Sequence, residues 1–217
     1  MTTHDTRHRG SGRVDFTLMY AAHDAFRRDL YRLQASVAAG HASDPATRAG
    51  WASFTRELHV HHTVEDAALW PPLRQKTYRP DEVAVLDAME AEHARIDPLL
   101  APVEAAVAGT PGADPAESAE ALASALTAHR QHEETTALPL LEQHLGQPGW
   151  DAFLDEIRKR QGLTGGARFL PWLLDGAPAE TTHRVLDKLP PPARLLYRAI
   201  WRPNYVRTPR LGSSCSL

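Results

Sequence analysis

Two segments of the chain repeat a pattern of residues that can bind a metal ion. The first, HHTVEDAALWPPL, begins at His61, and the second, HRQHEETTALPLL, begins at His129. In each, a glutamate follows the first histidine by four positions, a second acid comes directly after it, and a proline stands ten positions after the histidine. Residues four apart lie on one face of a helix. Each segment therefore places an imidazole beside a carboxylate, and both groups are ligands for transition metals.

Four long helices are expected to position these residues. Segments of helical period lie at about residues 14–39, 45–76, 80–109 and 116–145, and a weaker helix is expected at about 150–161. Each long segment contains an apolar stripe with steps of three and four residues, which is typical of a helix that faces a core. Strand-like alternation of β-branched and polar residues is missing. The chain therefore predicts an all-α fold, an antiparallel up-down four-helix bundle.

Histidine or glutamate interrupts each of these apolar stripes. The six interrupting residues are His23, His61, Glu65, His93, His129 and Glu133. A buried carboxylate without a partner costs several kcal/mol, so these groups must satisfy one another or share an ion. His61 follows His23 by 38 positions, and His129 follows His93 by 36. These similar spacings allow a pseudo-twofold bundle with all four histidines at one level.

Four imidazoles and two carboxylates suit a pair of iron ions. Imidazole is a common ligand of iron, and a carboxylate can bridge two metals. If each iron takes two histidines, one oxygen from each bridging glutamate and a bridging oxo or hydroxo group, five donors are used. One position then stays open for O2, NO or peroxide. Zinc or manganese would accept the same donors, because ligand type alone does not select the metal.

These segments resemble the hemerythrin-like HHE cation-binding family. The resemblance lies in HDAF from His23, HHTVEDAALWP from His61, EHARI from Glu92 and HRQHEETTALP from His129, within about residues 14–145. It implies a four-helix bundle with a non-haem di-iron centre whose ligands are the six residues named above. It also implies a role in binding or sensing O2 or NO, or in iron and redox homeostasis.

The third helix departs from the family's oxygen carriers. Those hemerythrins have two histidines four residues apart on that helix, whereas here Met89 stands four before His93 and Asp97 four after it. The resulting site is poorer in histidine and richer in oxygen donors. It is similar to the iron-sensing hemerythrin-like domain of a ubiquitin-ligase subunit, which disfavours simple reversible O2 carriage.

Several neighbouring residues are alternative ligands. His62 would replace His61 after a small rotation or add a ligand, and Asp97 is a candidate for the position missing on the third helix. His59 and His132 are expected at the flank of the site. The other histidines, expected to be exposed, are His4, His8, His41, His144 and His183.

Two further pairs of residues repeat between the halves. Asp66 and Glu134 are expected either to accept hydrogen bonds from imidazole N–H groups or to be exposed charges. The pairs Trp70-Pro71 and Leu138-Pro139 are expected to end or kink their helices.

The last quarter of the chain is expected to form a short helical extension. A glycine- and proline-rich connection is predicted first, then short helices at about 179–189 and 192–201, then a loose tail. Five large apolar residues there would be costly in water as one patch; they are Phe169, Trp172, Leu173, Tyr197 and Trp201. They are expected to pack on the bundle, with a homodimer or partner surface as the alternative.

The predicted organisation has three parts. Residues 1–12 are expected to be a disordered leader, residues 13–161 the hemerythrin-like bundle with its di-iron site, and residues 162–217 the extension and tail. The N-terminus lacks the apolar core of a signal peptide, and no apolar run approaches the roughly 18 residues of a membrane span. With one cysteine, Cys215, the chain is expected to be cytoplasmic. The net charge of −3 and pI of about 6.4 do not favour nucleic acid as a partner.

Three functions fit these observations. The first is a binding or sensing protein whose di-iron centre takes O2 or NO. The second is a di-iron enzyme that activates O2 or peroxide as an oxidase, oxygenase or catalase-like protein, and a deep pocket beside the metals lined partly by residues 165–201 would favour it. The third is a structural or storage role, which a closed and saturated site would favour.

Overall fold

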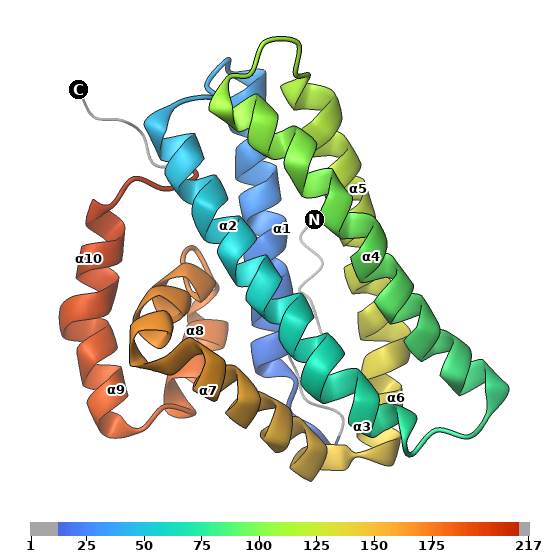
Figure 1. Ribbon diagram of the computed structural model, residues 1–217. Coiled ribbons are helices and arrows are strands. Elements are labelled where there is room, and N and C mark those ends of the chain that lie inside the picture. The colour runs from blue at the N-terminus through green and yellow to red at the C-terminus, as the bar shows by residue number, and fades with distance from the viewer. Residues whose placement is uncertain (1–12, 213–217) are drawn as a thin grey trace, which may run out of the picture.

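The structure is a computed structural model that describes residues 13–212, and the regular structure of this part is entirely helical (Figure 1). The all-α prediction is confirmed for these residues, while the predicted leader, residues 1–12, and Cys215 lie outside them. The α-helices are α1 (Thr17–Ala38), α2 (Pro45–Val64), α3 (Trp70–Arg74), α4 (Pro80–Ala108), α5 (Pro115–His132), α6 (Leu138–His144), α7 (Gly146–Leu173), α8 (Ala179–Asp187), α9 (Pro191–Leu196) and α10 (Arg202–Arg207).

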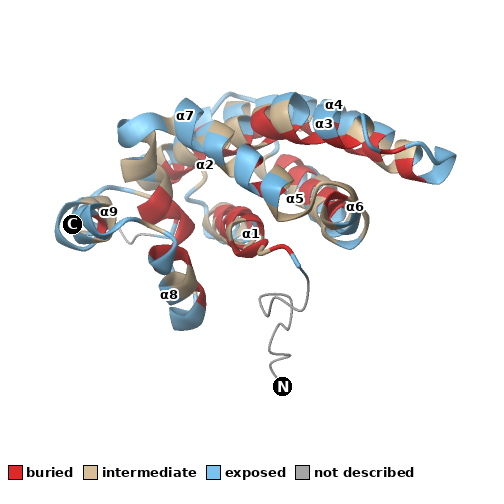
Figure 2. Ribbon diagram, turned by 90° about the horizontal axis from the view of Figure 1, so that it is seen from below, coloured by how far each residue is buried: buried red, intermediate tan, exposed pale blue. Residues whose placement is uncertain are grey.

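Four long helices enclose the centre of the molecule. Helix α1 packs against α2 and α5, and α4 packs against the same two helices. Their buried sides face one another when the molecule is seen from below (Figure 2). Helices α2, α4 and α5 each begin with a proline at the first position, where the missing N–H costs no hydrogen bond.

A π-helical segment precedes each proline of the repeated motifs. These segments are Glu65–Leu69, before Pro71, and Glu133–Ala137, before Pro139. In each, the backbone N–H after the segment donates to the carbonyl of the glutamate that begins it. Helical structure then continues to Arg74 and His144, so the prolines do not end the helices. The irregularity expected there takes the form of wider turns, which are common at functional sites.

The core has two apolar clusters with a polar layer between them. One contains Phe26, Leu30 and Leu126, and the other contains Met89 and Leu141. In each of the four chain segments, the motif histidine falls between residues of the two clusters. This arrangement holds the polar layer inside the molecule, away from both ends of the helices.

The C-terminal part packs on α1 and α2, as preferred from the sequence. Trp172, Leu173 and Tyr197 are buried in the same apolar cluster as the bundle residues. The indole N–H of Trp172 donates to Asp29 of α1 at 2.7 Å. Helices α7 to α10 lie together on the side of α1 and α2 that faces away from α4 and α5 (Figure 1).

Two details of that region were predicted wrongly. The expected glycine- and proline-rich connection is helical as far as Leu173, with the chain leaving helical geometry only at Gly162 (φ 58°, ψ −170°). Residues Arg202–Arg207 of the expected loose tail form α10, and Leu211 is buried. Apolar contacts with the bundle override the local tendency of glycine and proline to form a loop.

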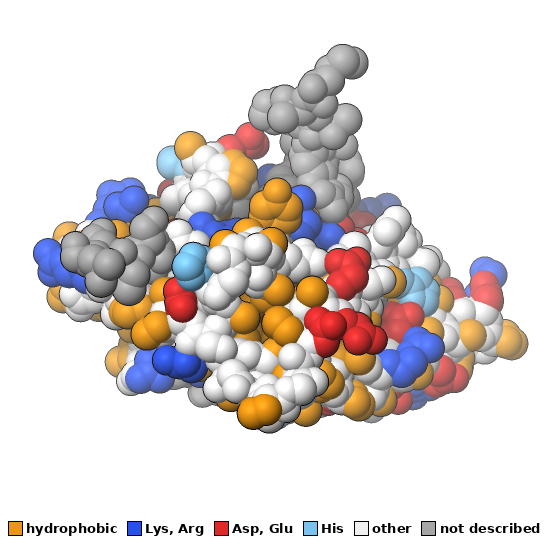
Figure 3. Space-filling model, turned by 90° about the horizontal axis from the view of Figure 1, so that it is seen from above, with side chains coloured by type: hydrophobic (Ala, Val, Ile, Leu, Met, Phe, Trp, Pro, Cys, Tyr) orange, Lys and Arg blue, Asp and Glu red, His pale blue; other side chains and the backbone are white. Residues whose placement is uncertain are grey.

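A helix that crosses a membrane must be both long and apolar. Among residues 13–212, none of the helices combines the length and the apolar character of a membrane span. On the face seen from above, acidic, basic and hydrophobic side chains occur together (Figure 3).

Candidate metal centre

The polar layer contains two groups of donor atoms, each compact enough to hold one ion. Cluster 1 consists of His23, His61 and Glu133, and cluster 2 of His62, His93 and His129. Within each cluster, one atom from each residue lies within 4.8 Å of the others. Five imidazoles and a carboxylate from four helices thus meet at one level of the fold.

In cluster 1 the donor atoms face one another at short distances. His23 Nε2 lies 3.0 Å from Glu133 Oε2 and 3.4 Å from His61 Nε2. His23 and Glu133 are buried, and the side chain of His61 is 10% exposed. Cluster 1 therefore has one edge that is less completely enclosed.

Cluster 2 is built from imidazoles alone. His93 Nε2 lies 3.1 Å from His129 Nε2, and the ring of His62 stacks on that of His93 with centroids 3.9 Å apart. All three residues are buried. His62, which the sequence offered as an alternative to His61, thus joins a different cluster.

Glu65 lies between the two clusters. Its Oε1 is 3.2 Å from His61 Nε2, and its Oε2 is 3.6 Å from His93 Nε2. Its two oxygens therefore face different clusters, so this one carboxylate could contact a cation held at either. The structure brings together all six residues singled out from the sequence and adds His62.

The donor atoms fit a cation because the protein satisfies them incompletely. Among the described residues, both ring nitrogens of His62 are buried without a hydrogen-bond partner. Glu65 and Glu133 are fully buried and contact imidazole nitrogens of the same layer at 3.0 to 3.6 Å. Buried polar groups in native proteins are normally hydrogen-bonded, and unpaired buried carboxylates are costly. A metal ion bound to these atoms would remove that cost.

Two carboxylates accept hydrogen bonds from the outer nitrogens of cluster histidines. Nδ1 of His23 donates to Glu134 at 2.8 Å, and Nδ1 of His93 donates to Asp66 at 2.8 Å. Asp66 and Glu134 are thereby confirmed as imidazole acceptors, and each one joins the two halves of the chain. Such bonds fix the ring and leave Nε2 free for a metal.

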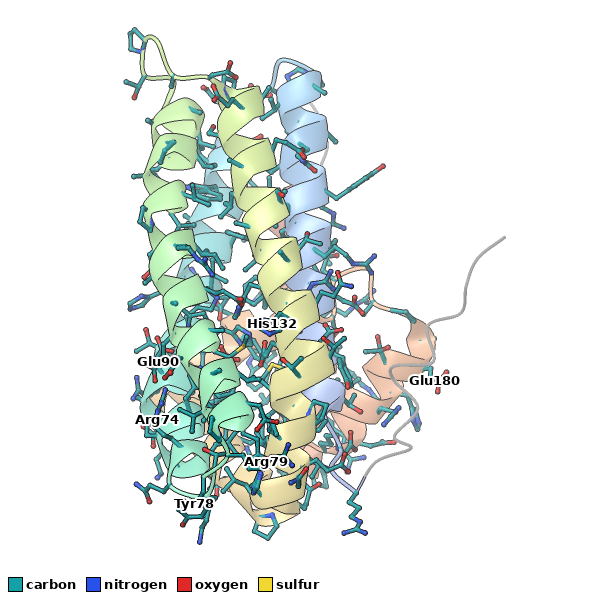
Figure 4. All side chains as sticks on the ribbon, turned by 90° about the vertical axis from the view of Figure 1, so that its right-hand side faces the viewer. Arg74, Tyr78, Arg79, Glu90, His132 and Glu180 are labelled. Atoms are coloured by element: carbon teal, nitrogen blue, oxygen red, sulfur yellow. The ribbon has the colours of Figure 1, made fainter. Side chains whose placement is uncertain are left out.

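Glu92 of α4 is a supporting residue that the sequence analysis missed. It accepts a hydrogen bond from Nδ1 of His129 and another from Nδ1 of His132, both at 2.8 Å. His132 is labelled in Figure 4, on α5 where that helix faces α4. Glu92 directly precedes His93, but only the packing of α4 on α5 places it beside His129.

The protonation of the metal-free layer follows from burial and neighbouring charges. Burial lowers the pKa of His23, but the charges and hydrogen bonds of Glu133 and Glu134 outweigh it and raise this pKa to about 9. Burial holds the pKa of His61 well below its usual value, and nearby imidazoles lower it further. Burial, with the charges of Glu133 and Asp66, holds the pKa of Glu65 well above its usual value. A cation bound here would displace protons from these groups.

Two cavities adjoin His61 of cluster 1. A small one, of about 10 Å³, is lined by His23, His61, His62 and His129, and a void of that size holds about one water molecule. A large one, of about 540 Å³, lies between α1, α2 and the C-terminal helices and includes His61 in its wall.

The remaining sequence candidates lie outside the clusters. Asp97 is exposed, and its Oδ1 is 4.0 Å from Nδ1 of His62. His59, His41 and His183 are exposed. His144, expected to be exposed, is half-buried and lies 3.2 Å from Glu82, because α6 continues past Pro139 and turns this residue toward α4. His4 and His8 lie outside the described residues.

Comparison with known proteins identifies the family-level relationship. The model of the hemerythrin HHE cation binding domain matches residues 14–141. No curated protein and no solved structure matches the chain. The matched residues include all six residues of the two clusters and Glu65 between them.

Proposed function

The chain belongs to the hemerythrin HHE cation-binding family, and from this premise we propose that it is a non-haem di-iron protein that binds or senses a small ligand such as O2, NO or peroxide. Membership of the family indicates metal binding. The observation that supports two ions is Glu65, whose oxygens face different histidine clusters at 3.2 and 3.6 Å. In this proposal one iron lies at each cluster, with an oxo or hydroxo bridge.

The unequal clusters indicate where the small ligand binds. Cluster 2 supplies three imidazoles, whereas cluster 1 supplies two imidazoles and one carboxylate. If Glu65 and Glu133 each contributed to both ions, the iron held at cluster 1 would have one protein donor fewer. The small cavity lined by His23, His61, His62 and His129 would then hold the small ligand.

The protein's own residues would act mainly by positioning and by excluding water. When bound, a pair of iron ions supplies redox chemistry and an open position for a small ligand. Glu134 and Asp66 orient His23 and His93 through their outer nitrogens. Phe26, whose ring centroid lies 5.3 Å from that of His61, makes the surroundings of cluster 1 apolar.

A second candidate is a di-iron oxidoreductase that acts on an organic substrate. The observation in its favour is the cavity of about 540 Å³ that reaches His61 and is lined partly by residues 166–193. Cavities of about 300–1,000 Å³ are typical of small-molecule sites. A space of this size would admit an organic substrate as well as a diatomic molecule.

Three structural features belong to the same proposal. Helices α1, α2, α4 and α5 form the antiparallel up-down bundle of the family, residues 13–161 are the metal-binding domain, and residues 162–217 are a C-terminal extension whose described part, to residue 212, covers one side of it. The exposed residues Leu195 and Ile200 provide a surface through which two copies can associate as a homodimer.

The proposal is tested by iron quantification and optical spectroscopy after aerobic purification. We expect about two iron ions per chain, oxo-bridged di-iron absorbance that dithionite removes, and a spectral change with NO. His61→Ala should lose half or more of the iron, while His59→Ala, an exposed change on the same helix, should keep it. Full iron content in His61→Ala would refute the site, and an iron-loaded protein that ignores NO and peroxide would refute the small-ligand function.

A further inference from the structure

The large cavity is a built compartment between the bundle and the C-terminal helices. It lies against α1 and α2 on one side and α7, α8 and the start of α9 on the other. Its volume of about 540 Å³ is in the range of cavities that hold organic molecules. Because three chain segments form its wall, it exists only when the extension is packed on the bundle.

The interior of the cavity is apolar and deeply buried. Met19, Phe26, Trp150, Phe153 and Val185 line it, and each is at most 2% exposed. Water in such a space forms few hydrogen bonds, so transfer of apolar surface into it is favourable. The interior therefore suits a hydrocarbon or aromatic body.

The wall of the cavity contains two cationic side chains that are more exposed than its apolar lining. Arg158 and Lys188 are in its wall, and their side chains are 64% and 32% exposed. Arg158 pairs with Asp155 and Lys188 with Asp15, and each cation keeps further N–H donors for another acceptor.

One acid lies in the wall, but its charge is already compensated. Glu57 is buried, and Arg56 lies 3.0 Å from its Oε1. Its Oε2 accepts a hydrogen bond from Gln161 at 3.0 Å. The more exposed part of the wall therefore carries the two cations, whose remaining N–H donors favour an anionic head group, while His61, 10% exposed, is in the more buried part.

We propose that this cavity binds a carboxylic acid with a long apolar tail, with the carboxylate beside Arg158 and Lys188 and the tail directed to His61. The assignment of this molecule as a substrate rests on the proposed di-iron function, because only a metal at cluster 1 would give the tail a reaction partner. Binding itself rests on the shape, burial and charge of the cavity.

Chain length provides the first test. Titration calorimetry of the iron-loaded protein should show saturable binding of dodecanoate at one molecule per chain. Affinity should rise about fourfold for each CH2 added from octanoate to dodecanoate, because each buried CH2 contributes a constant increment. Absence of saturable dodecanoate binding, or affinity independent of chain length, would overturn the proposal.

The head group provides the second test. Dodecanol has the same tail without the charge, and we expect it to bind about fivefold more weakly, as the loss of a partly exposed ion pair implies. Arg158→Met combined with Lys188→Met should remove this difference. Equal affinities for the acid and the alcohol in the unchanged protein would refute the position of the carboxylate.

A cavity-filling variant provides the third test. Gly166 lines the cavity, and a Cβ there would meet no atom within 4 Å, so Gly166→Phe can fill the space without displacing backbone. We expect it to weaken dodecanoate binding about tenfold or more. Ala121→Phe adds the same ring on an exposed face of α5 and should leave binding unchanged. Unchanged binding in Gly166→Phe would place the ligand elsewhere.

Iron content measured on the same samples separates the two proposals. Gly166→Phe is expected to keep its iron, because Gly166 is outside both clusters. A preparation that binds dodecanoate but no iron would refute the metal centre and support the cavity. An iron-loaded preparation that does not bind dodecanoate would refute the cavity and leave the metal centre.

Discussion

The two histidine clusters come from the same repeated motif, yet they differ at two equivalent positions. The residue before the first-helix histidine, Ala22, corresponds to Glu92 before His93. The residue after His61 is His62, and the residue after His129 is Arg130. Glu92 and His62 both serve cluster 2, as an acceptor for His129 and as a third imidazole.

This difference explains why cluster 1 reaches the large cavity and cluster 2 does not. Ala22 lines the large cavity, at the position where the other half of the chain has a carboxylate. Within the described residues, no carboxylate is recorded on the outer nitrogen of His61. Differences at two positions of a repeated motif thus leave cluster 1, but not cluster 2, beside the large cavity.

Removal of the shared carboxylate should break both clusters and have the largest effect. We expect Glu65→Gln to lose most of the iron, because Glu65 is the residue that lies between the clusters. In the metal-free protein at pH 7, the same change should raise the free energy of unfolding by about 1–3 kcal/mol, because it removes a buried group whose ionisation is disfavoured in the folded state and whose pKa is held well above its usual value. Metal analysis and denaturant unfolding check the two effects, and retention of both irons would contradict the bridge.

Removing the third imidazole of cluster 2 should make the two clusters more alike. His62→Ala should lower the iron content toward one ion per chain, because cluster 2 loses that imidazole, and metal analysis measures the loss.

Adding a third imidazole to cluster 1 should have the converse effect on ligand access. Arg130→His should add an imidazole on the cluster 1 side and slow NO binding, while keeping both irons. Stopped-flow absorbance measures the rate, and an unchanged rate in Arg130→His would argue against the open position at cluster 1.

Loss of an outer carboxylate should have an intermediate effect. Glu92→Gln leaves the donor atoms of cluster 2 intact but weakens the hold on His129 and His132, and comparable changes elsewhere lower metal affinity about 10–100-fold. Competition with a chelator measures this loss. Glu90→Gln, an exposed change on the same helix whose partner is Arg74 (both labelled in Figure 4), is the matched control and should retain full affinity.

The smallest effect on stability is expected for Asp15, which pairs with Lys188 in the wall of the large cavity. Hydrogen bonds from Lys188 and Thr17 outweigh burial and lower the pKa of Asp15 to about 2. The side chain of Asp15 is 39% exposed, so solvent screening limits its contribution to about 1 kcal/mol.

Since the folded-state pKa of Asp15 is below the ordinary value of 3.8, this stabilisation is present above about pH 4 and is lost as the pH falls toward 2. Asp15→Asn should therefore lower the free energy of unfolding by about 1 kcal/mol at pH 7 and by less at pH 3. Denaturant unfolding at the two pH values measures the difference. An equal loss at both pH values would show that the carboxylate charge is not responsible.

Much of the candidate metal centre could be predicted, because the spacing of residues along a helix determines which side chains share a face. The i,i+4 placement of His61 and Glu65 in an apolar stripe fixes their relative positions before any tertiary contact forms. The cost of their burial then requires compensating neighbours. His62 was offered as an alternative or added ligand, but its cluster could not be predicted, and the role of Glu92 was missed. Each contacts a residue on another helix, and the rotation of one helix against its neighbour is not encoded by local spacing.

The amino-acid sequence alone determined the helical segments, the apolar stripes and the six polar residues that interrupt them, since these depend on period and residue type. Tertiary structure decided the division of those residues into two unequal clusters and the packing of α7 to α10 beside one of them. Glycine and proline in residues 162–178 favour a loop locally, but burial of Leu170, Trp172 and Leu173 on the bundle stabilises a helix there. The cavity beside His61 exists because of that packing.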